Sequence, residues 1–276
     1  MNSYISYDDL AIIYNDLSAT GGNDLTLMRR FAEAASRQFD IHSGRRCFVM
    51  DETRYYPGAG SKLWLDDDLL SITSLKTDDD GDGTFETTWA ATDYQLLPMN
   101  GVPYEAIEIS DFGTQSSFAA GVRRGVEIVG SFGIGNAVDV DPVVRSATTV
   151  GEELDASETS VTVSSQTDTD GLRTIRVDSE QMYITSVNTA TLTVVRGVNG
   201  TTAATHSTSA AIDYFVYPED VVQAVAMQAG RWWQQRAGGF ASDTIGGLEF
   251  GEIRPSNELV GDLRDVIAYY RRQHIG

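Results

Sequence analysis

Cysteine and histidine are scarce in this 276-residue chain. The single cysteine, Cys47, excludes an internal disulfide framework and a cysteine-rich metal site, and its place in an apolar run predicts a small core side chain. The three histidines are His42, His206 and His274. None of them lies near a nucleophile motif, and no two have the spacing of zinc ligands. The sequence therefore indicates neither a zinc centre nor a nucleophilic enzyme.

Long hydrophobic runs and phosphate-binding loops are also missing. No stretch of eighteen apolar residues exists, and Asp8 and Asp9 stand where a signal peptide would be basic and then apolar. The glycine-rich segments "PGAGSK" (57–62) and "GSFGIGNA" (130–137) lack the residue order or the following helix that a phosphate site needs. We therefore expect synthesis in the host cytoplasm, no membrane partner, no cofactor and no enzymatic activity.

Basic residues are few compared with acidic ones. The chain has 20 basic and 40 acidic residues, a formal charge of −20, and only Lys62 and Lys76 are lysines. Such an acidic surface repels a nucleic-acid backbone, which disfavours sequence-specific DNA binding. It suits a surface past which DNA moves without adhering, and it also suits a protein from a salty host.

Helical patterns occur at both ends of the chain. The first predicted helix has an apolar face of Leu10, Ile13, Tyr14 and Leu17, and Ser6 and Asp9 are spaced as its capping box. The second runs from about residue 24 to residue 41 and stops at Gly44; its stripe is Met28, Phe31, Ala35 and Phe39. We expect both helices to pack against helices from the other chain end.

Two further helices are predicted near the C-terminus. One begins at Pro218 and buries Val221, Val225, Ala229, Trp232 and Trp233. A glycine-rich linker, 238–251, separates it from a last helix at about 257–272, whose apolar face is Leu259, Leu263, Ile267 and Tyr270. The expected fold class is α+β, with about four helices in a bundle beside a small β-layer.

The middle of the chain has the alternating pattern of β-strands. Residues 45–130 contain short runs such as "YEAIEI" and "VEIVG" between turn residues, which predicts a small, mostly antiparallel β-layer. Residues 143–216 are rich in Thr, Ser and Val without a helical pattern, which predicts an inserted all-β module. The predicted domains are therefore 1–142 and 217–276, which form the host, and the module at 143–216.

An aspartate-rich segment, "KTDDDGDGTFETTW" (76–89), lies between two predicted strands. Asp78, Asp80 and Asp82 occupy the first ligand positions of a helix-loop-helix calcium loop, and Gly83 follows as its glycine. The twelfth position is Trp89, which cannot ligate an ion. The segment is therefore a hairpin turn in which Asp-Gly pairs supply positive φ, or at most a weak, partial calcium site.

The C-terminal segment "DLRDVIAYYRRQHIG" concentrates arginine and tyrosine in an otherwise acidic chain. Its candidate interface residues are Arg264, Tyr269, Tyr270, Arg271 and Arg272. Tyrosine and arginine are common anchors of protein interfaces. The alternative is that the arginines only complement the dipole of the last helix.

Several of these segments together resemble the head-to-tail connector, or adaptor, proteins of long-tailed phages and related viruses. The resemblance rests on "RRFAEAASRQFDIHSGRRCF" (29–48), the run from 54 to 100, "VEIVGSFGIG" (126–135) and "PEDVVQAVAMQAGRWWQQR" (218–236). It covers roughly 1–140 and 217–276. The segment "SEQMYITSVNTATLTVVRGVNGTTAATHS" departs from that plan and is similar to small β-modules of phage tail and neck proteins.

The resemblance implies a virion structural protein in the neck between capsid and tail. It implies a ring, usually dodecameric, that docks beneath the portal protein, continues the DNA channel and receives a stopper or tail-completion protein. The C-terminal helix would reach toward the portal. A competing interpretation is a carbohydrate- or receptor-binding tail protein, in which the β-module binds the ligand and Asp78, Asp80 and Asp82 hold calcium.

Overall fold

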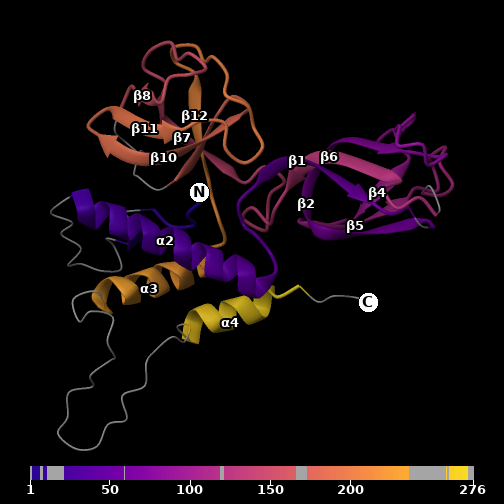
Figure 1. The fold of residues 1–276 in the computed structure, drawn as a ribbon, viewed down its shortest axis with the longest axis horizontal. Coiled ribbons are helices and arrows are strands. Elements are labelled where there is room, and N and C mark those ends of the chain that lie inside the picture. The colour runs from indigo at the N-terminus through magenta and orange to yellow at the C-terminus, as the bar shows by residue number, and fades with distance from the viewer. Residues whose placement is uncertain are drawn as a thin grey trace, which may run out of the picture.

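The computed structural model describes residues 2–6, 9–10, 22–58, 60–118, 121–165, 173–235, 259 and 261–272. Figure 1 shows a helical unit and two separate β-bodies that meet near the N-terminus. The helical unit contains α2 (Gly22–Ser43), α3 (Glu219–Gln235) and α4 (Gly261–Tyr270). None of the described helices is long and apolar enough to cross a membrane.

The helical unit follows the sequence pattern closely. The predicted capping box is confirmed, because the Ser6 N–H donates to Asp9 Oδ2 at 2.7 Å and the Asp9 N–H donates to Ser6 Oγ at 3.0 Å. The helix that starts there is described only at Asp9 and Leu10, and the rest of its predicted face lies outside the described residues. Helix α2 ends at Gly44, whose φ of 69° provides the left-handed C-terminal turn.

One apolar core holds the helices together. Helices α2, α3 and α4 pack on one another (Figure 1), and the buried side chains between them come from both chain ends. They include Met28, Ala35 and Phe39 of α2, Val221, Val225, Ala229 and Trp233 of α3, and Leu263 and Ile267 of α4. The four predicted apolar faces are therefore confirmed wherever their residues are described.

The first β-body is a six-stranded antiparallel sheet. Its strands are β1 (Met50–Tyr56), β2 (Lys62–Thr77), β3 (Thr87–Thr88), β4 (Tyr94–Leu97), β5 (Tyr104–Ile109) and β6 (Val126–Phe132). The strand order is β1-β6-β2-β5-β4, and β3 pairs with β2 outside this order. The 16-residue β2 pairs with β5 along its first half and with β6 along its second half, and irregularities in both registers accompany this change of partner.

The second β-body is the predicted module. Its strands are β7 (Val143–Thr149), β8 (Ser160–Thr162), β9 (Thr174–Val177), β10 (Glu180–Asn188), β11 (Thr191–Val195) and β12 (Ala211–Phe215), in the order β7-β12-β9-β10-β11-β8. The two outer strands also meet. Val150 bridges Val163, and the Ser164 N–H donates to the Thr149 carbonyl at 2.9 Å. The sheet therefore closes on itself around its own apolar core.

The prediction of a helical bundle with a small β-layer is wrong. The described residues form two six-stranded antiparallel sheets and only three described helices, so the molecule is mostly β. One strand is also longer than its local sequence indicates, because "DDD" at 66–68 is typical of a turn but runs within β2. Arg45 pairs with the buried Asp68 at 2.6 Å, and Arg46 and Arg54 each pair with Asp67 at 2.8 Å. These arginines neutralise the acids, so the strand continues.

The module packs directly against the host. The Asp51 N–H of β1 donates to the Asn199 carbonyl at 2.9 Å. A Cβ at Gly200 would lie 1.9 Å from the Asp51 carbonyl oxygen, so only glycine permits this approach. Phe215, at the end of β12, packs with Val49 and Leu70 of the host. The boundaries at 143 and 216 therefore lie inside a packed junction.

Candidate functional site

The predicted interface residues at the C-terminus fall into two groups. Tyr269 is 81% exposed, and Arg264 and Arg271 also lie at the surface. Tyr270 and Arg272, in contrast, make contacts inside the molecule. The structure therefore does not bring the five residues into one patch.

Tyr270 anchors α4 to the other helices. Its ring meets Phe39 of α2 edge-on with centroids 5.7 Å apart, and its hydroxyl donates to Asp220 Oδ1 of α3 at 3.1 Å. Burial, together with the negative charge of Asp220, raises the pKa of the Tyr270 hydroxyl above its usual value. The neutral hydroxyl is therefore retained as a hydrogen-bond donor at neutral pH.

Arg272 ties the end of α4 to the first β-body. Its Nη2 donates to the Leu65 carbonyl of β2 at 2.7 Å, and its backbone N–H donates to the Ser43 carbonyl at 3.1 Å. Sequence reasoning missed both contacts because the partners are distant in the chain. Helix α4 is therefore part of the helical core, not an arm that moves independently of it.

The aspartate-rich segment is a turn, as predicted, and its geometry is more specific than the sequence indicated. Asp78 is only 2% exposed, and its two carboxylate oxygens accept the N–H groups of Gly81 at 2.7 Å and Gly83 at 2.9 Å. Both glycines have positive φ, 81° and 93°. The loop is therefore held by a buried carboxylate and by glycine conformations.

A fourth carboxylate joins the three predicted ones. Ligand oxygens of Asp78, Asp80, Asp82 and Glu86 all lie within 4.8 Å of one another. Glu86 is the ninth residue counted from Asp78, so a search for a ligand at the twelfth position misses it. Four clustered carboxylates suit a hard cation such as Ca²⁺. The hydrogen bonds of Asp78 nevertheless fix the turn without one.

We therefore expect the hairpin to depend on Asp78 rather than on calcium. Asp78→Ala should lower the free energy of unfolding by about 2–3 kcal/mol, because two N–H groups lose a charged acceptor. Asp80→Ala, at an exposed position, is the matched control and should cost about 0.5 kcal/mol or less. Thermal unfolding with and without a chelator should differ by under about 2 °C. A chelator effect of many degrees would contradict this expectation.

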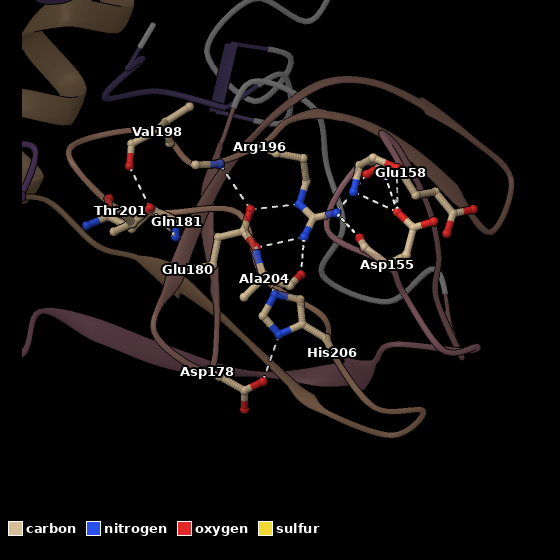
Figure 2. Close-up of polar contacts among 12 residues, drawn as sticks. Asp155, Glu158, Asp178, Glu180, Gln181, Arg196, Val198, Thr201, Ala204 and His206 are labelled. Atoms are coloured by element: carbon tan, nitrogen blue, oxygen red, sulfur yellow. Dashed lines mark hydrogen bonds and ion pairs between the residues drawn. The ribbon is translucent and has the colours of Figure 1, made fainter.

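A buried charged cluster in the module was not predicted. Glu180 on β10 and Arg196 after β11 form a bidentate pair, with Nε–Oε1 and Nη2–Oε2 both at 2.7 Å. Figure 2 shows the guanidinium facing the carboxylate, with His206 beside it. The ring of His206 lies between Asp178 Oδ2, 2.7 Å from Nδ1, and Glu180 Oε2, 2.9 Å from Nε2. Arg196 and His206, which both lie between β11 and β12, thus converge on Glu180.

The remaining contacts of this cluster engage the rest of the Arg196 guanidinium. The Arg196 Nη1 donates to the carbonyls of Asp155 and Glu158, and Nη2 also donates to the Ala204 carbonyl at 2.6 Å. Burial alone would raise the pKa of Glu180, but hydrogen bonds from Arg196, the Ala204 N–H and His206 lower it to about 2. The carboxylate is therefore ionised and fully engaged, which indicates a structural role.

The signal for this cluster was present in the sequence. A Glu, an Arg and a His stand alone among the apolar and hydroxyl residues of "SEQMYITSVNTATLTVVRGVNGTTAATHS". Isolated charged residues in a strongly alternating segment are buried only when they are paired. Their pairing could have been proposed from that rule, although the particular partners could not.

Comparison with models of known protein families finds no match, and a search of curated proteins finds no relative.

Proposed function

We propose that the protein is a head-to-tail adaptor of a tailed virus, a structural protein rather than an enzyme. Copies of it would form a ring, by analogy a dodecamer, beneath the portal protein in the neck of the virion. The ring would continue the DNA channel and receive a stopper or tail-completion protein on its other side. The motif resemblance of the host segments motivates the proposal.

The observation that best supports the proposal is that Tyr269 and Arg271 are exposed on a turn whose other residues are held by internal contacts. Tyr270 and Arg272 fasten the same turn to α2, α3 and β2, so the two exposed side chains are held outward by inward-facing neighbours. Because their backbone is already held, Tyr269 and Arg271 would lose little backbone entropy on binding. An exposed arginine also suits bidentate pairing with a partner carboxylate.

The charge of the chain supports a role in a DNA channel. With 40 acidic and 20 basic residues, a ring of this protein would present a strongly negative surface. Phosphates approaching such a wall are repelled at short range, so DNA passes without adhering. A sequence-specific DNA-binding protein would need the opposite sign.

Docking to a portal is the direct test. The double variant Tyr269→Ala/Arg271→Ala should melt within about 2 °C of wild type, because both side chains are exposed, yet lose at least tenfold in affinity for purified portal rings. The matched control is Phe112→Ala/Arg123→Ala, which removes an exposed aromatic and an exposed arginine elsewhere. Equal portal binding by both double variants would contradict the proposed docking surface.

Ring formation should depend on salt. Because each copy carries a formal charge of −20, copies repel one another at low ionic strength. We expect light scattering to find monomers or small oligomers in dilute low-salt buffer, and rings at high salt, at high concentration or on a portal. A stable dimer that ignores salt would argue against the adaptor.

The carboxylate cluster of the 78–86 hairpin favours a second candidate, a carbohydrate- or receptor-binding tail protein that uses calcium. This candidate requires glycan binding that a chelator abolishes. Glycan binding measured with and without chelator on the same preparation therefore separates it from the adaptor, for which no glycan should bind.

A further inference from the structure

The dipeptide Asn-Gly occurs twice in the sequence, at Asn100–Gly101 and at Asn199–Gly200. In this dipeptide the backbone nitrogen of glycine can attack the side-chain carbonyl carbon of asparagine, because glycine has no side chain to block the approach. The new C–N bond closes a succinimide ring, and the side-chain nitrogen leaves as ammonia with the proton of the glycine N–H. Water then opens the ring at either carbonyl, which gives aspartate or isoaspartate without oxidation or reduction.

Asn100 lies in the turn between β4 and β5, where nothing restrains its side chain. Both Asn100 and Gly101 are exposed, and a Cβ on Gly101 would meet no other atom within 4 Å. Within the part of the chain that the structure describes, no residue forms a hydrogen bond with the Asn100 amide. The Asn100 side chain can therefore turn toward the Gly101 nitrogen without breaking any of these contacts.

Asn199 belongs to the same dipeptide, but both ends of its amide are bonded. Its Nδ2 donates to Asn2 Oδ1 at 2.9 Å and to Gln181 Oε1 at 2.8 Å, and its Oδ1 accepts the Asn2 Nδ2 at 2.6 Å. Asn2 and Gln181 are themselves buried. Ring closure turns the side-chain carbonyl carbon toward the Gly200 nitrogen and releases Nδ2, so the reaction has to break these bonds.

The backbone around Asn199 is also held in place. The Asn199 carbonyl accepts the Asp51 N–H at 2.9 Å, and the Asp51 carbonyl oxygen approaches Gly200 so closely that a Cβ there would lie 1.9 Å from it. Asn199 has a φ of 56°, in the left-handed region that asparagine tolerates better than most residues. The peptide unit that would react is therefore packed into the contact between the module and the host.

We propose that Asn100 is a site of spontaneous deamidation in the folded protein, and that the contact between module and host protects Asn199 from the same reaction. The proposal is independent of the adaptor, because it concerns chemistry within one chain. Protection matters because an aspartate at position 199 would leave Asn2 Oδ1 and Gln181 Oε1 without the donor that they share. Deamidation there would weaken the contact that prevents it.

Peptide mass spectrometry of the whole chain, incubated at neutral pH and digested at intervals, tests the proposal. Asn199 reacts only from conformations in which its three hydrogen bonds are open, which should make it about 100-fold slower than Asn100. In denaturant the two sites should react at similar rates, since both are followed by glycine. A ratio below about tenfold in the folded protein, or an Asn100 that reacts only in denaturant, would overturn the proposal.

Gly101→Ala is the matched control for the reaction at Asn100. Gly101 lies outside the left-handed region and has open space around its Cα, so alanine fits there without strain. The added methyl group hinders attack by the nitrogen of residue 101, and Asn100 should react at least about tenfold more slowly. The rate at Asn199 should stay as in the wild type. An unchanged rate at Asn100 would show that the modification does not proceed through this ring.

The protection of Asn199 has its own test. Gln181→Met keeps most of the side-chain volume but removes one acceptor of Nδ2, so Asn199 should react about fivefold faster or more. Asn100, in the same molecule, should keep its rate and serves as the internal control. Should Gln181→Met fail to fold, Asn2→Ala removes the other two bonds and should accelerate Asn199 as well. A rate at Asn199 that neither variant changes would overturn protection by these bonds.

Discussion

Replacing Arg196 with methionine is expected to lower the free energy of unfolding of the module by about 3–5 kcal/mol. The substitution leaves the Glu180 carboxylate, whose side chain is 0% exposed, without its bidentate partner, and a buried charge without a partner is costly. Three backbone carbonyls, of Asp155, Glu158 and Ala204, lose their donor as well.

The measurement is denaturant unfolding of the full chain, with hydrogen exchange to locate the loss in β9–β11. The double variant Glu180→Gln/Arg196→Met removes both charges and should recover part of the lost stability, since no unpaired charge remains. Glu152→Gln, at an exposed position, is the control and should change stability by under about 0.5 kcal/mol. A control as damaging as Arg196→Met would show that burial is not the cause.

The Glu180 cluster also makes the stability of the module depend on pH in the acid range. The pKa of Glu180 is lowered from 4.5 to about 2 in the folded protein. A lowered pKa contributes stability that is present above the unfolded value of 4.5 and is lost as the pH falls toward 2. We expect the melting temperature of the module to fall over this interval, and to fall less in Glu180→Gln.

Replacing Tyr270 and Arg272 together with alanine is expected to lower the free energy of unfolding by about 3–5 kcal/mol. The first change removes an aromatic ring packed on Phe39 and a hydrogen bond to Asp220, and the second removes a charged donor to the Leu65 carbonyl. Urea unfolding measures the loss, and hydrogen exchange should show α4 losing protection first. The double variant at Tyr269 and Arg271 is the matched control.

Tyr270 and Arg272 are unsuitable positions at which to test docking, because both side chains hold the fold together. A variant that removes Tyr270 or Arg272 would lose structure, so its failure to bind any partner says nothing about the proposed docking surface. A stability loss in Tyr269→Ala/Arg271→Ala equal to that of Tyr270→Ala/Arg272→Ala would contradict the division of the segment into inward and outward residues.

Much of the helical unit could be predicted from the sequence because helix signals are local. The Ser6–Asp9 capping box, the stop at Gly44 and the apolar stripe of α2 are each defined by residues that lie close together in the chain. The strands of the module were also recognisable, since alternation over five or more residues is a local pattern.

The sheets and the sites depended on contacts between distant residues, which a local pattern does not contain. The run Asp66–Asp68 is typical of a turn, and only the arginines at 45, 46 and 54 keep it within β2. The inward direction of Tyr270 depends on Asp220, fifty residues away. Glu86 was missed for another reason: it stands at the ninth position of the calcium loop, and only the first, third, fifth, sixth and twelfth positions were compared with the pattern.

The first and last strands of the module are neighbours, and this has a consequence for how the protein can change over evolution. Val143 of β7 lies opposite Phe215 of β12, so the two junctions with the host are one strand spacing apart. Recombination could exchange everything between them for another unit with adjacent ends, provided that Val143 and Phe215 remain to cover Val49 and Leu70 and that the new unit replaces the contact of Asn199 with Asp51. Relatives of this protein are therefore expected to differ by whole-segment replacement at this point, with the host sequence continuing unchanged on both sides.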